Sequence, residues 1–130
     1  MRVMAIVILI LGVASLALGV LFITEASSAE QEIADSIQPL KIAEVDARYE
    51  AVKANQMALR MTEEPQIQAG KAAPSAMYNY LTIQRTSLGL TRSQIGLASF
   101  TRTSGIINVI LGAGLILAGV GLLKRSQSLA

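Results

Sequence analysis

The sequence GIINVILGAGLILAGVGLL, from Gly105 to Leu123, contains no charged residue, and Lys124 and Arg125 follow it directly. An α-helix of this length is about as long as the hydrocarbon core of a lipid bilayer is thick. We therefore predict a transmembrane helix over residues 105–123. Its one strongly polar side chain is Asn108, for which we expect a hydrogen bond to a neighbouring helix.

A second apolar run, MAIVILILGVASLALGVLFIT, extends from Met4 to Thr24 and is also long enough to span a bilayer. It is longer than the roughly 7–15 apolar residues typical of a cleaved signal peptide. We interpret residues 1–24 as a transmembrane helix that serves as an uncleaved signal anchor. A signal peptide cleaved near Ser27–Ala29 is the alternative.

The composition narrows the possible functions. Hydrophobic residues make up 52% of the chain, and there is no Cys and no His. This excludes disulfides, thiolate or imidazole metal ligands and His-based acid–base catalysis. Neither apolar run contains Asp or Glu, so a proton relay within the membrane is not expected. We predict a protein that is not an enzyme, uses no cofactor and binds no nucleic acid.

Small residues recur every seven positions in both apolar runs, which is the spacing of a helix-packing seam. Small side chains let two membrane helices approach closely. We predict that these residues either pack the two spans together or face a neighbouring subunit. They are Ala5, Gly12, Gly19, Gly105, Gly112 and Gly119.

Residues 25–104, between the two runs, have a helical pattern. We expect one helix up to Thr62, with a kink or a restart at Pro39, and a turn over residues 63–75. Ser75 is the expected N-cap of a second helix over residues 76–103. That helix carries two sets of apolar residues at seven-residue spacing. One set is Leu81, Leu88 and Ile95, and the other is Ile83, Leu90 and Leu97.

The two predicted arms differ in charge. All nine acidic residues lie between Glu25 and Glu64, whereas residues 65–103 contain four basic residues and no acidic one. Opposite charges favour antiparallel pairing of the arms. Counting from the membrane places Arg102 beside Glu25, Arg92 beside Glu32 or Asp35, and Arg85 near Glu44. The same alignment places Gly12 near Gly112 and Gly19 near Gly105.

The predicted fold class is therefore an all-α membrane protein with two transmembrane helices. They are extended by an extramembrane antiparallel helical hairpin that resembles a coiled coil. Arg2, Lys124 and Arg125 flank the spans on one side, so the positive-inside rule places both termini in the cytoplasm. Residues 25–104 would be extracytoplasmic, and residues 124–130 a cytoplasmic tail of a protein in the cell membrane.

These features favour a structural or accessory membrane protein. Its expected partners are the lipid bilayer and either further copies of itself or other membrane subunits. Two alternatives stay open at this point. One is a sensor-like helical module that signals through a partner, and the other is a pore-forming oligomer.

Overall fold

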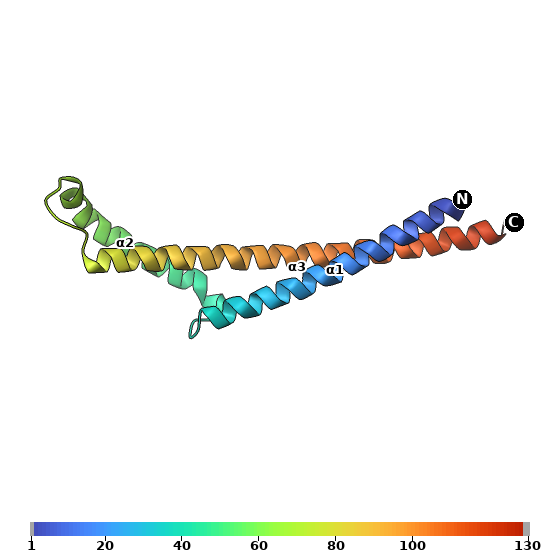
Figure 1. Cartoon of the computed structure of the whole chain (residues 1–130), viewed down its shortest axis with the longest axis horizontal. Coiled ribbons are helices and arrows are strands. Elements are labelled where there is room, and N and C mark those ends of the chain that lie inside the picture. The colour runs from blue at the N-terminus through green and yellow to red at the C-terminus, as the bar shows by residue number, and fades with distance from the viewer. Residues whose placement is uncertain (1, 129–130) are drawn as a thin grey trace. The chain divides into compact units, whose positions relative to one another are not determined.

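The computed structural model describes residues 2–128, and within that range all regular structure is helical. The elements are α1 (Arg2–Ser36), the 3₁₀-helix η1 (Ile42–Glu44), α2 (Val45–Gln68) and α3 (Ala76–Ser128) (Figure 1). The chain divides into two compact units. We call Met1–Gln31 with Leu97–Ala130 the apolar unit, and Glu32–Gly96 the polar unit. Helix α3 contributes residues to both.

Helix α1 continues well beyond the apolar run that ends at Thr24. No Gly or Pro interrupts it there, and the hydroxyl groups of Thr24 and Ser27 donate to carbonyls of the same helix. Thr24 Oγ1 donates to the carbonyl of Leu21 (2.8 Å) and Ser27 Oγ to that of Ile23 (3.0 Å). The helix ends at Ser36 because the residue before a proline is disfavoured in helical conformation, and Pro39 follows. The helical pattern restarts at Ile42 and α2, which is one of the two outcomes predicted for Pro39.

Helix α2 extends to Gln68, so the turn is shorter than the predicted segment 63–75 and comprises residues 69–75. Pro65 lies inside the helix rather than ending it. One turn earlier, Arg60 donates to Glu64 (2.8 Å) in an i,i+4 ion pair within this part of the helix. The helix instead ends at Gln68 and is followed by Ala69 and Gly70, and the φ of +68° at Gly70 suits glycine. Lys71 N and Gly70 N then bond to the carbonyls of Gln66 and Ile67, which completes a Schellman motif.

Helix α3 begins with the predicted cap. Ser75 Oγ accepts a hydrogen bond from Tyr78 N (3.1 Å), so the N-cap role of Ser75 is confirmed. The Glu63 carboxylate in α2 in turn accepts from Ser75 N (3.0 Å) and Ser75 Oγ (2.7 Å). This side chain therefore holds the start of α3 against the last turns of α2.

The polar unit has a narrow core. Val45, Val52 and Gln56 of α2 are buried on one helical face. Gln56 Nε2 donates to Thr82 Oγ1 (2.8 Å) and its Oε1 accepts from Arg85 (2.7 Å), so the buried amide is satisfied on α3. On α3, Leu81 and Leu88 are half-buried, whereas Ile83 is 69% exposed and Leu90 is 62% exposed. Only one of the two apolar sets in this helix is thus covered within the polar unit.

Candidate functional site

The candidate site is the contact between α1 and α3 in the apolar unit. Its buried residues are all small and recur every seven positions on both helices. We call them the small-residue seam. They are Ala5, Gly12, Gly19, Ala26, Ala98, Gly105, Gly112 and Gly119.

The seam brings the two backbones into direct contact. A Cβ atom added to Gly112 would lie 2.6 Å from Leu16 N and 2.7 Å from the carbonyl oxygen of Gly12. One added to Gly19 would lie 2.6 Å from the carbonyl oxygen of Gly105. These distances exclude any side chain without movement of a helix. The structure therefore has Gly12 against Gly112 and Gly19 against Gly105, the two neighbours placed together by the sequence alignment.

The two helices are antiparallel along the seam. Gly119 faces the start of α1, where an added Cβ would lie 3.2 Å from the carbonyl oxygen of Ala5. Gly114 and Gly121 are on the same helix, and an added Cβ at either would meet nothing within 4 Å. Close packing is thus confined to one face of α3, and it fits a helical hairpin (Figure 1).

Asn108 lies beside the seam and is half-buried. Its backbone carbonyl accepts a hydrogen bond from Ser15 Oγ of α1 at 3.0 Å. The interhelical bond at this position therefore uses the main chain of Asn108, with the side chain of Ser15 as the donor. Sequence reasoning missed Ser15. Its place three residues after Gly12, on the flank of the seam, is the signal that could have found it.

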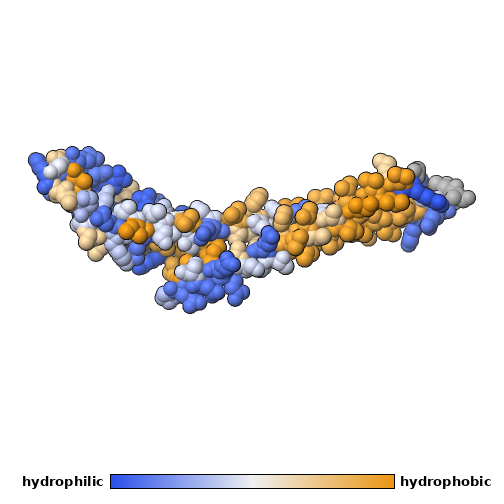
Figure 2. All heavy atoms as spheres, viewed as in Figure 1, coloured by the Kyte–Doolittle hydropathy of each residue, from blue (hydrophilic) through white to orange (hydrophobic). Residues whose placement is uncertain are grey.

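The rest of this pair presents apolar side chains outward. For example, Ile10 is 63% exposed, Ile110 is 67% exposed and Leu117 is 75% exposed. Hydrophobic residues cover the face of the apolar helices seen in Figure 2. Both α1 and α3 are long and apolar enough to cross a membrane.

The ion pair of Arg102 differs from the prediction. Arg102 bonds to Glu30 at 3.1 Å rather than to Glu25. The reason is rotation around α1: Glu30 lies four residues after seam residue Ala26 and so shares its face. Glu25 precedes Ala26 by one residue and is turned away by about 100°. Counting heights along the helix ignores this rotation.

The prediction for Arg92 was also wrong, because it pairs with neither Glu32 nor Asp35. Arg92 Nε lies 2.7 Å from Asp46 Oδ1, and its Nη1 lies 3.7 Å from Glu50. The guanidinium also stacks on the Tyr49 ring, 5.4 Å from the centroid. All of these groups belong to the polar unit, where they join α2 to α3.

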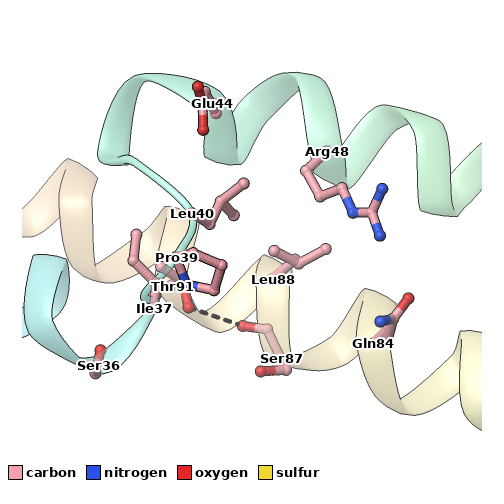
Figure 3. A pocket seen from close by; sticks show the side chains of 10 residues that line it. All are labelled: Ser36, Ile37, Pro39, Leu40, Glu44, Arg48, Gln84, Ser87, Leu88 and Thr91. Atoms are coloured by element: carbon pink, nitrogen blue, oxygen red, sulfur yellow. Dashed lines mark hydrogen bonds between the residues drawn. The ribbon is translucent and has the colours of Figure 1, made fainter.

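The interruption around Pro39 explains this difference. Ile37, which directly follows α1, and Arg48 in α2 line one cavity of about 470 Å³, together with Leu88 of α3 (Figure 3). In an unbroken helix these two residues would be about 16 Å apart along the axis. Because the chain turns back beside the same part of α3, acidic residues after the break come level with Arg92.

Arg85 is likewise not beside Glu44. It donates to Gln56, whereas Glu44 lines the cavity and its carboxylate accepts from Lys41 N (3.1 Å). Glu44 therefore serves the turn after Pro39 rather than the contact between the arms. It caps η1 from its third position.

Ionisation is perturbed at one exposed pair in α2. The hydrogen bond from Arg60 lowers the pKa of the Glu64 carboxyl below its ordinary value, and the pKa of Arg60 is raised by the same contact. Residues 2–128 contain no group of three or more acidic residues placed to hold a metal ion. The arrangement described here can pack helices and pair charges.

No protein-family model, curated protein or solved structure matches this chain.

Proposed function

We propose that this chain is a non-catalytic structural or accessory protein of a cell membrane. In this proposal the apolar parts of α1 and α3 cross the bilayer as an antiparallel pair. The polar unit stands outside the membrane, and the protein packs with further copies or with other membrane subunits.

The small-residue seam is the observation that carries the proposal. Water does not drive membrane helices together, so they associate through close packing and interhelical hydrogen bonds. The seam and the Ser15–Asn108 bond supply both. The large side chains that a soluble helix pair would bury, among them Ile110 and Leu117, point outward instead. Lipid tails are the environment that suits this arrangement.

The hydroxyl groups within α1 support the same conclusion. The hydroxyl groups of Thr24 and Ser27 donate hydrogen bonds to backbone carbonyls of the preceding turn. Such bonds let polar residues approach a hydrocarbon boundary without unsatisfied donors. Both helices also keep their backbone bonds internal, which is required of segments that cross a bilayer.

The proposed orientation rests on basic residues. Arg2 precedes the first apolar run, and Lys124 and Arg125 follow the second. The positive-inside rule assigns this side to the cytoplasm. The polar unit is then extracytoplasmic. On that side Lys41 is the one basic residue within twenty positions of the first run, whereas Arg85, Arg92 and Arg102 precede the second run and count against this orientation.

Cysteine labelling tests the proposal cleanly because the chain has no Cys of its own. We expect Ala54→Cys, exposed on α2, to react with a membrane-impermeant maleimide in intact cells. We expect Gln127→Cys, exposed near the end of α3, to react only after permeabilisation. Both variants should stay in the membrane pellet at alkaline pH.

Release of the protein into the alkaline supernatant would overturn the membrane assignment. Labelling of both positions in intact cells would overturn the two-span topology. The reverse pattern, with only Gln127→Cys labelled, would invert the orientation and leave the spans in place.

A further inference from the structure

The part of α3 in the polar unit has an apolar face that nothing in the unit covers. Ile83 and Leu90 lie seven residues apart and are 69% and 62% exposed, and Tyr80 on the same face is 55% exposed. Every buried residue of α3 belongs to the apolar unit. Exposed apolar rows of this kind mark interaction surfaces.

This face is also free of charge. Between Ala76 and Gly96 the charged residues are Arg85 and Arg92, which lie on the opposite side of the helix and bond to Gln56 and Asp46 of α2. The positions flanking the apolar row are Ser, Thr and Gln. They are Thr86, Ser87, Ser93 and Gln94.

We propose that this face pairs with the same face of a second copy of the chain. The inference rests on the proposed function, because copies anchored in one membrane share their orientation. Their α3 helices would then lie parallel, with Ile83 against Ile83 and Leu90 against Leu90 around a twofold axis. No like charges meet in this arrangement, and a charged partner would find nothing on the face to pair with.

The small core of the polar unit gives a reason for the pairing. Its buried residues are Ile33, Val45, Val52 and Gln56, so few apolar side chains are fully removed from water within one copy. Pairing two copies adds a second seam to α3 and turns two helix pairs into a four-helix arrangement.

Crosslinking tests the face directly. In liposomes under mild oxidation, we expect Leu90→Cys to form a disulfide-linked dimer. Ala54→Cys, exposed on the face of α2 that points away from α3, is the matched control and should remain monomeric. Equal dimer formation by the two variants would overturn the proposal.

Sedimentation in detergent measures the affinity. We expect the double variant Ile83→Gln/Leu90→Gln to raise the dimer dissociation constant by at least about 100-fold, since four apolar side chains leave the interface. Met57→Gln/Met61→Gln changes two exposed apolar residues on α2 and should leave the constant unchanged. Circular dichroism checks that both variants stay helical.

A parent chain that remains monomeric at every concentration would overturn the pairing, as would a loss of dimer in the methionine variant alone. Extraction at alkaline pH separates this failure from that of the proposed function. A monomer that stays in the membrane pellet refutes the pairing and leaves the membrane role intact.

Discussion

At the scale of single residues, two glycines of one helix have opposite surroundings. Gly112 touches the backbone of α1, whereas Gly114 faces open space. Alanine raises intrinsic helix propensity by about 1 kcal/mol at either position. Any loss of stability specific to Gly112 must therefore come from the contact between the helices.

We expect Gly112→Ala to destabilise the helix pair by about 1–3 kcal/mol, because the new methyl group must push the helices apart. Gly114→Ala should be neutral or slightly stabilising. Unfolding in mixed micelles, followed by circular dichroism during titration with a denaturing detergent, gives both values. Equal effects of the two variants would refute the close contact.

The Arg60–Glu64 pair gives a pH dependence. The pKa of Glu64 is lowered in the folded chain, so the unfolded chain binds more protons in the acid range. The contribution of Glu64 to stability is full above the ordinary glutamate pKa of about 4.3, and it is lost as the pH falls below that value.

NMR titration of the Glu64 side-chain carboxyl should give a midpoint below that of an isolated glutamate. The variant Arg60→Gln should return the midpoint to the ordinary range. An unchanged midpoint in this variant would show that Arg60 does not cause the shift.

At the scale of elements, the sequence predicted the contact between the two apolar helices better than the contact between the arms. The seam could be predicted because small residues recur every seven positions on both helices, so the sequence identifies both partners of a contact such as Gly12 with Gly112. The charged residues have no comparable repeat. Glu25 and Glu30 lie about 7.5 Å apart along the helix axis, and the pairing with Arg102 also depends on their rotation about that axis. Asp35 and Asp46 are separated by the break at Pro39, and no residue pattern specifies the path of the chain there.

Turn lengths were hard to predict for a related reason. Pro65 signals a helix end, but α2 continues through it to Gln68, and no residue pattern marks this continuation. The cap at Ser75 was predictable from its residue type, whereas the bonds from Glu63 depend on how the turn folds back.

The alignment of α2 with α3 can be tested by crosslinking of introduced cysteines. Gln56 Nε2 donates to Thr82 Oγ1 at 2.8 Å across the two helices, so we expect a short bifunctional thiol reagent to bridge Gln56→Cys/Thr82→Cys within one chain. Asn55→Cys/Thr82→Cys, with Asn55 exposed, is the matched control and should be bridged much less. Mass spectrometry of tryptic peptides distinguishes the two. Bridging of the control alone would mean a different alignment.

At the scale of the whole molecule, the two units differ in what holds them together. The apolar unit relies on backbone contact between small residues, and its large side chains point outward. The polar unit relies on a few buried side chains, a satisfied amide and exposed ion pairs, each of which contributes little. We expect the polar unit to open more readily than the apolar unit when the latter is in a membrane.

Hydrogen–deuterium exchange of the chain in lipid nanodiscs tests the central claim, which is that the seam joins two helices within a bilayer. Water is scarce in the hydrocarbon core, so amides of residues 5–23 and 106–122 should remain protonated for hours. Amides of residues 76–96, on the same helix α3 but outside the membrane, should exchange much faster. Exchange of residues 106–122 at the rate of residues 76–96 would contradict the account.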